Sequence, residues 1–233
     1  MRKALLVTVI TFASLARAEY TEAPVTNGGT ISGRITYDGT PPKPEKVTIT
    51  QDPGTCGTSR ELDELEVSST GGVKDAVVYL VDIKSGKKMD LPAKPELDQK
   101  GCRYQPHVQI VARNAELEVK NSDPILHNIH SYQEGRTILN IAEPKQGMVV
   151  GKKMNKAGGE SLKCDIHNFM RGALFVAENP YAVLTDAEGK YEIKDVPPGT
   201  YQIGTFQEVA GTKLGTVTVP AGGKATYDAK IKK

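Results

Sequence analysis

Residues able to bind a soft metal ion gather in two short stretches near the middle of the chain. The first stretch holds His127 and His130, and the second holds Cys164, His167 and Met170 at steps of three. A thiolate, an imidazole and a thioether together select soft metals over hard cations. On a strand a step of three reverses the face, so the second group can converge only in a compact loop.

A further ligand must come from a neighbouring strand, and the two histidines of the first stretch compete for this place. They lie three residues apart, so only one can face the cysteine loop if the segment is extended. We expect His127, because it follows the turn at Pro124 and precedes Asn128, whose side chain can hydrogen-bond across to the cysteine loop. His130 is interpreted as an ordinary side chain on the opposite face.

Two imidazoles and a thiolate with a weak axial methionine form the ligand set of a blue-copper electron-transfer site. Zinc is disfavoured, because its structural sites use cysteine and histidine rather than methionine. We therefore predict one mononuclear copper site with the ligands His127, Cys164, His167 and Met170. Ligation also explains an unpaired cysteine in a chain that has three.

These motifs carry a family resemblance. The run from Asn121 to Asn128 (NSDPILHN), together with Cys164-x-x-His167-x-x-Met170, resembles the cupredoxins, particularly the short-loop amicyanin type. The resemblance covers residues 76–178 and implies a Greek-key β-sandwich in which the four predicted ligands bind copper. It also implies that His167 reaches the surface as the electron port, where redox partner proteins dock through small, transient interfaces.

Strands are the elements expected to position these residues. From Tyr104 onward short apolar runs alternate with turn residues at the spacing typical of β-sandwiches. Arg113-Asn114 separates two such runs and predicts a tight hairpin. No long amphipathic helix pattern is present, so we expect an all-β protein.

A second, smaller β-sandwich is expected over residues 179–233. Its turns Asp186-Ala-Glu-Gly189 and Val196-Pro-Pro-Gly199 resemble those of the carboxypeptidase regulatory-like (transthyretin-like) family. That family usually begins with a strand similar to residues 31–39. The N-terminal strands and loop of residues 19–75 would then complete the C-terminal sandwich, with the copper domain inserted between them; the sequence leaves this open.

The first residues predict export. Arg2 and Lys3 precede an apolar run that ends in Ala16-Arg17-Ala18, which is typical of a secretory signal peptide over residues 1–18. The run is shorter than the about 20 apolar residues that span a bilayer, so we expect a periplasmic or secreted protein without a membrane span. Cleavage changes the formal net charge from +2 to −1, which excludes a basic field for nucleic acid.

An oxidising compartment also bears on the remaining cysteines. Cys56 and Cys102 both lie in turn-like segments and are predicted to form a disulfide, with a second soft-metal site as the alternative. His107, near the start of a strand, is interpreted as a hydrogen-bonded structural histidine rather than part of a second site.

The expected function is therefore electron transfer by an exported copper-binding protein. A single copper with four protein ligands has no open position for a substrate, so we do not expect an enzyme. Two alternatives stay open. One is a copper carrier or buffer without a redox role, and the other is a metal-free β-sandwich adhesion or scaffold protein.

Overall fold

The computed structural model describes residues 19–62 and 64–233, so the predicted signal peptide lies outside the described residues. Within this part of the chain the secondary structure consists of 21 strands and one four-residue helix, α1 (Pro53–Cys56). The expected all-β class is confirmed. No helix among the described residues is long and apolar enough to cross a membrane.

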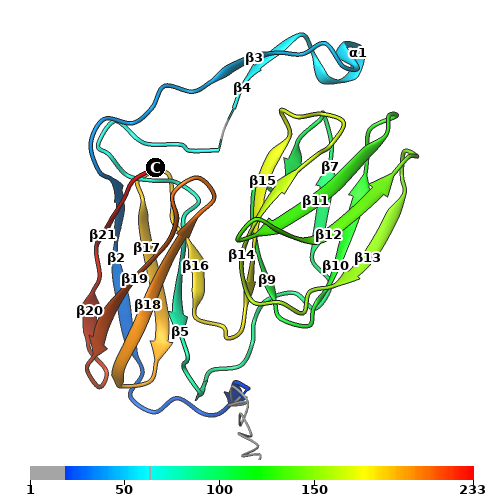
Figure 1. Ribbon diagram of the computed structural model, residues 1–233. Helices are drawn as coiled ribbons and strands as arrows, with labels where there is room; N and C mark the ends of the chain where they lie inside the picture. The colour runs from blue at the N-terminus through cyan, green and yellow to red at the C-terminus, as the bar shows by residue number, and fades with distance from the viewer. Residues whose placement is uncertain (1–18, 63) are drawn as a thin grey trace, which may run out of the picture.

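The strands form two β-sandwiches that lie side by side, as Figure 1 shows. The central sandwich, drawn in green and yellow, contains residues 96–177. One of its sheets has the spatial order β13 (Val149–Lys153), β10 (Glu116–Asn121), β7 (Glu96–Gln99) and β8 (Tyr104–Gln105). The other has the order β12 (Arg136–Glu143), β11 (His127–Gln133), β14 (Gly158–Lys163), β15 (Arg171–Ala177) and β9 (Val108–Ala112).

The core of the central sandwich is built from alternating apolar side chains of both sheets. Leu117 and Val119 of β10 are fully buried against Ile129 of β11 and Leu162 of β14. In β11 the same alternation turns His127, Ile129 and Ser131 inward. His127 therefore lies at the end of an apolar core, where the strand begins.

The predicted hairpin at Arg113-Asn114 is wrong. β9 pairs with β15 in the five-stranded sheet, whereas β10 pairs with β7 and β13 in the four-stranded sheet. Residues 113–115 thus carry the chain from one sheet to the other, and Asn114 adopts a φ of 70° to make the crossing. Each strand buries its apolar face against the facing sheet instead of pairing with its neighbour in sequence.

The second sandwich combines strands from both ends of the described chain. One sheet has the order β16 (Ala182–Leu184), β5 (Val77–Val81), β18 (Gly199–Gln207) and β19 (Gly211–Val219). The other has the order β17 (Lys190–Val196), β2 (Gly29–Tyr37) and β20 (Lys224–Thr226), with β21 (Ala229–Ile231) paired to the far end of β2. The N-terminal β2 thus pairs with C-terminal strands.

The pairing of β5 differs from the predicted domain boundary at residue 76. β5 lies between β16 and β18 and is no part of the central sandwich. Its apolar run arises because both faces are covered. Val78 and Leu80 are buried in the core of the second sandwich, and Val77 is buried in the contact between the two sandwiches. In that contact the ring centroid of Phe175 lies 4.4 Å from that of Tyr79.

Residues 45–62, which we call the cap, leave the second sandwich and pass over one end of the central one (Figure 1). The cap is a hairpin of β3 (Lys46–Thr48) and β4 (Ser59–Glu61) with α1 at its tip. A disulfide joins Cys56 of α1 to Cys102 of the central sandwich, which confirms the predicted pairing. Elsewhere β1 (Thr21–Glu22) pairs in parallel with β6 (Ser85–Gly86).

Candidate metal centre

Strand register brings the two predicted ligand stretches together. β14 is antiparallel to both β11 and β15, with Lys163 paired to His130 on one side and to Arg171 on the other. The loop of residues 164–170 therefore starts beyond His130 and runs beside the beginning of β11, where His127 lies. The backbone N–H of Met170 donates to the carbonyl of His167 at 2.8 Å, which folds the loop on itself.

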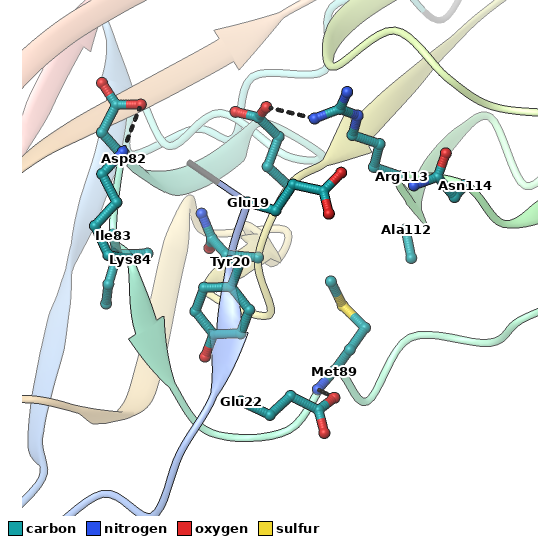
Figure 2. A pocket seen from close by; sticks show the side chains of 12 residues that line it. Glu19, Tyr20, Glu22, Asp82, Ile83, Lys84, Met89, Ala112, Arg113 and Asn114 are labelled. Atoms are coloured by element: carbon teal, nitrogen blue, oxygen red, sulfur yellow. Dashed lines mark hydrogen bonds and ion pairs between the residues drawn. The ribbon is translucent and has the colours of Figure 1, made fainter. Parts of the chain in front are cut away.

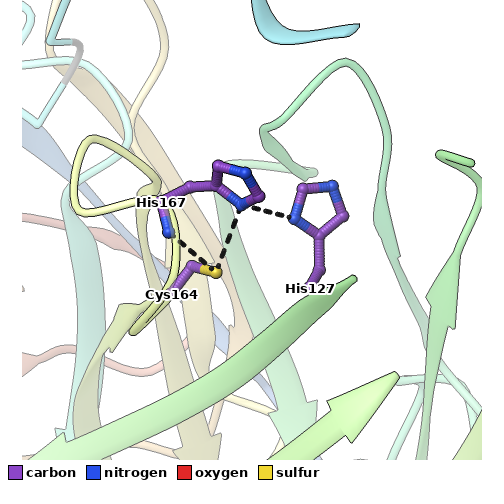
Figure 3. A group of neighbouring side chains, drawn as sticks. All are labelled: His127, Cys164 and His167. Atoms are coloured by element: carbon purple, nitrogen blue, oxygen red, sulfur yellow. Dashed lines mark hydrogen bonds between the residues drawn. The ribbon is translucent and has the colours of Figure 1, made fainter. Parts of the chain in front are cut away.

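Three of the predicted ligands converge at this place, as Figure 3 shows. Nδ1 of His127 lies 3.1 Å from Nδ1 of His167, and Sγ of Cys164 lies 3.7 Å from the same Nδ1. The three potential ligand atoms all lie within 4.8 Å of one another. Both histidines are fully buried and Cys164 is 2% exposed, so water does not reach the cluster freely.

The spacing of these atoms suits a single metal ion. Zinc, for which protein bond lengths are well defined, lies about 2.0–2.1 Å from imidazole nitrogen and about 2.3 Å from thiolate sulfur. Two donor atoms of one ion of this size are therefore about 3–4 Å apart, which agrees with the 3.1 Å and 3.7 Å separations. Three electron-pair donors that face one another need a cation between them, either a proton or a metal ion.

Two carboxylates bind the outer nitrogens of the two imidazoles. Nε2 of His127 lies 2.9 Å from Oδ2 of Asp123, and Nε2 of His167 lies 3.0 Å from Oδ2 of Asp52. An ionised carboxylate only accepts hydrogen bonds, so each Nε2 donates to its carboxylate and each ring turns its Nδ1 to the cluster. The donor set of two imidazole nitrogens and one sulfur therefore fits a metal of the copper class.

Hydrogen bonds lower the pKa values of the Cys164 thiol and of both carboxylates. Burial lowers the pKa of His167, but hydrogen bonds to Cys164 and Asp52 raise it overall, so a metal ion must displace the proton that these groups favour. Burial alone raises the pKa of the Cys164 thiol, but hydrogen bonds from His127 and His167 outweigh burial and lower it to about 6. Hydrogen bonds from Gln51 and His167 lower the pKa of Asp52. Burial raises the pKa of Asp123, but the backbone N–H groups of Cys102 and Gly101 lower it overall. The sulfur is thus a thiolate near neutral pH, and both carboxylates are ionised.

Met170, the fourth predicted ligand, lies at the end of the same loop. Its side chain is 1% exposed and belongs to the same buried cluster as Cys164 and Phe169. Its role as an axial ligand stays a prediction.

His167 is not the exposed electron port that the family resemblance implies. Its side chain has no exposed surface, because Asp52 and the rest of the cap cover the imidazole. The Asp52 side chain is 33% exposed and is the group above His167 that meets solvent. The carboxylate between His167 and solvent therefore comes from the cap, which lies outside the metal-ligand motif.

Asn128 and His130, the two polar neighbours of the cluster on β11, have the different roles that the sequence predicts. Asn128 hydrogen-bonds across to the cysteine loop, with its amide donating to the Asp165 carboxylate at 2.8 Å and its oxygen accepting the Asp165 N–H at 2.7 Å. This prediction is confirmed. His130 stays outside the cluster, where its ring bonds Asp165 and Thr137.

Two other candidate sites in the described residues lie outside the His–Cys cluster. His107 is hydrogen-bonded to the buried Glu208, as its structural interpretation requires. A cavity of about 250 Å³, shown in Figure 2, lies near Tyr20, Met89 and Arg113, and shares no residue with the His–Cys cluster. Both cationic side chains of its lining are paired there, Arg113 with Glu178 and Lys84 with Asp82.

Comparisons with known proteins give partial structural likenesses. A purple cupredoxin from Nitrosopumilus maritimus is 18% identical and matches 36% of this chain and 99% of its own, with a TM-score of 0.31. A reduced amicyanin variant is 20% identical and matches 36% of this chain and 82% of its own, with a TM-score of 0.33. A copper-containing nitrite reductase from Thermus scotoductus SA-01 is 20% identical over 43% of this chain, with a TM-score of 0.33.

The last of these likenesses spans only 25% of the nitrite reductase chain. No protein-family model matches this sequence. No curated protein matches it either. The likenesses all have TM-scores below 0.5, so the function proposed next depends on the side chains of the cluster alone.

Proposed function

We propose that this chain is an exported copper protein that transfers single electrons. His127, Cys164 and His167 would hold the metal, with Met170 as the weak axial ligand. The observation that carries the proposal is the convergence of Nδ1 of His127, Nδ1 of His167 and Sγ of Cys164 in a buried cluster whose outer nitrogens are bound by carboxylates. When bound, copper supplies a one-electron couple between Cu(I) and Cu(II).

The chain's own contribution is a ligand frame that moves little. His127 is fixed at the start of β11 by pairing to Glu143 of β12, and Cys164 follows the end of β14. Asn128 ties the loop at Asp165 back to β11. The other three proposed ligands lie in this loop, and its hydrogen bonds to β11 hold it more precisely than a free loop would be held, which favours rapid electron exchange.

Burial favours electron transfer over copper carriage. A carrier must hand its metal to an acceptor, yet each of His127, Cys164 and His167 is at most 2% exposed. The Cys56–Cys102 disulfide anchors the cap that covers His167. Four protein ligands would fill the coordination sphere of the copper and leave no position on the metal for a substrate. We therefore propose that the chain is not an enzyme.

The cellular setting follows from the same proposal. A disulfide is typical of an oxidising compartment, and together with the predicted signal peptide it supports a periplasmic or secreted protein. Protein redox partners would then exchange electrons with the centre through transient contacts.

A loading and transfer experiment tests the proposed function against its alternatives. Purified protein is given one equivalent of Cu(II), cycled between oxidised and reduced forms, and then mixed with a copper-free acceptor protein. Electron transfer predicts reversible cycling with the copper retained. Delivery of copper to the acceptor would identify a carrier, and absence of copper uptake would leave a metal-free scaffold protein.

A further inference from the structure

The cap is docked on the central sandwich by several kinds of contact. Ile49 is 3% exposed and lies in the core of the central sandwich, together with Cys56. The guanidinium of Arg60 donates to the carbonyl of Gly101 at 2.9 Å and lies 5.1 Å from the ring centroid of Phe169. With the disulfide, these contacts fix the cap over the ligand loop.

Asp52 is the residue by which the cap reaches the cluster. It precedes α1 with a φ of 50°, a left-handed conformation that turns the chain into the helix. Its carbonyl accepts the backbone N–H of Cys56 at 2.9 Å, while its carboxylate accepts Nε2 of His167 at 3.0 Å. The position of Asp52 is thus tied to Cys56 on one side and to His167 on the other.

Asp123 has the matching place beside the other histidine. Its carboxylate accepts the backbone N–H of Gly101 and of Cys102, each at 2.8 Å, as well as Nε2 of His127. The turn that contains Cys102 therefore fixes the orientation of Asp123. Cys102 is also the disulfide partner of Cys56, so one covalent bond joins the supports of both carboxylates.

These contacts form a closed ring around the cluster. We propose that Asp52 and Asp123 are positioning residues of the metal centre, and that the Cys56–Cys102 disulfide couples them, so that the cap belongs to the metal centre. This inference rests on the proposed copper site. It assigns the disulfide a second task besides stabilising the fold, which is to hold two carboxylates against the outer nitrogens of two ligands.

The physical effect of this ring is electrostatic and geometric. A carboxylate on the outer nitrogen fixes the imidazole tautomer, orients the ring and increases the basicity of the ligating nitrogen. Its negative charge also favours the more highly charged Cu(II) over Cu(I). Loss of such an outer partner typically costs about 10–100-fold in metal affinity. If Cu(I) affinity is unchanged, each tenfold loss of Cu(II) affinity corresponds to about 59 mV of higher reduction potential.

The test compares variants of the full chain by Cu(II) affinity, reduction potential and the EPR spectrum. Asp52→Ala removes the acceptor, and Asp52→Asn keeps an acceptor without its charge. Glu61→Gln is the matched control, because Glu61 is an exposed carboxylate in the same cap. We expect Asp52→Ala to lose about 10–100-fold in Cu(II) affinity with a higher potential. Asp52→Asn should lie between Asp52→Ala and the wild type, and Glu61→Gln should behave as the wild type.

The role of the disulfide is tested by asking whether the effect of Asp52→Ala depends on the presence of the disulfide. In the Cys56→Ala/Cys102→Ala variant, the Cu(II) affinity should fall and the potential should rise. Adding Asp52→Ala to that variant should then change either quantity much less than in the wild type. An Asp52→Ala effect as large in the cysteine variant as in the wild type would overturn the coupling through the disulfide. Circular dichroism and thermal unfolding check that each variant is folded.

Two failures can be told apart. If wild-type protein takes up no Cu(II), the proposed copper function fails. If the wild type binds Cu(II) but Asp52→Ala has the same affinity, potential and EPR spectrum, the copper function stands and the inference about the cap is overturned.

Discussion

Nδ1 of His127 lies 3.1 Å from Nδ1 of His167, although the two residues are 40 positions apart in sequence. Without a proton or a metal ion between them, two imidazole nitrogens at this distance repel each other, and the nearby Cys164 sulfur adds a third electron-pair donor. Their outer nitrogens are engaged by Asp123 and Asp52. A cation between the three donors removes the repulsion, and the predictions below follow from placing copper there.

His127 and His130 form a matched pair for the assignment of ligands. His127→Ala removes one donor of the cluster and should cost more Cu(II) affinity than the about 10–100-fold typical of an outer partner. His130→Ala should bind Cu(II) as the wild type does, because its ring bonds Asp165 and Thr137 instead. Isothermal titration with Cu(II) measures both. Equal losses in the two variants would contradict the assignment.

Met170→Gln tests the axial ligand. An amide oxygen is a harder ligand than a thioether and favours Cu(II), so the reduction potential should fall while copper stays bound. The fall should be about 59 mV for each tenfold gain in the preference for Cu(II). Protein-film voltammetry measures it, with Met148→Gln, outside the ligand loop, as the control. An unchanged potential in Met170→Gln would argue against an axial methionine.

Glu160 should make stability depend on pH. Its side chain is fully buried, and among the described residues its Oε1 has no hydrogen-bond partner. Burial raises its pKa, against the opposing effects of a hydrogen bond from Ser131 and the charge of Lys156. The folded state therefore binds the proton more tightly than the unfolded state, whose glutamate pKa is about 4.3. The carboxylate costs stability increasingly as the pH rises from the unfolded pKa through the folded one.

Glu160→Gln should accordingly stabilise the protein near pH 7, by about 1 kcal/mol or more. The advantage should shrink as the pH falls through the unfolded pKa of about 4.3, because below it the glutamate is protonated in both states. Urea unfolding of both proteins at several pH values gives the free energies of unfolding. A difference that does not change with pH would show that the charge of Glu160 is not its cause.

Gly33→Ala tests the close approach of β2 to the C-terminal segment. A Cβ at this position would lie 1.9 Å from the carbonyl oxygen of Tyr227, so the backbone must shift. We expect a loss of about 1–3 kcal/mol in the free energy of unfolding. Gly54→Ala, whose added Cβ meets no atom within 4 Å, is the control. Equal stability of the two variants would mean that β2 does not pack as described.

Most strands and the ligand loop could be predicted from the sequence, because each depends on a pattern of neighbouring residues. Alternating apolar residues and turn residues predicted most of the strands, and the compact Cys164–Met170 loop followed from the spacing of its ligands. The hairpin error at Arg113-Asn114 has a physical reason, because a short turn joins paired strands and crosses between sheets equally well. β12 has a weak strand signal in the sequence, because it lies at the sheet edge and, of its residues, only Leu139 and Glu143 are buried.

The outer partners of the ligands were much harder to find. Asp123 lies four residues before His127, in a turn that the sequence marks with Pro124, and could have been suspected there. Asp52 is 115 residues from His167, in a segment that reads as a connection. Its only sequence signal is Cys56, whose predicted disulfide already placed that segment beside the central sandwich. Burial of His167 follows from this contact, which no local pattern encodes.

The most direct measurement is an optical and EPR titration of wild-type protein and Cys164→Ser with Cu(II). We expect the wild type to bind one equivalent, with an intense sulfur-to-copper charge-transfer band that Cys164→Ser lacks. A wild-type protein that stays colourless with Cu(II), or a serine variant that keeps the band, would contradict copper ligation by Cys164.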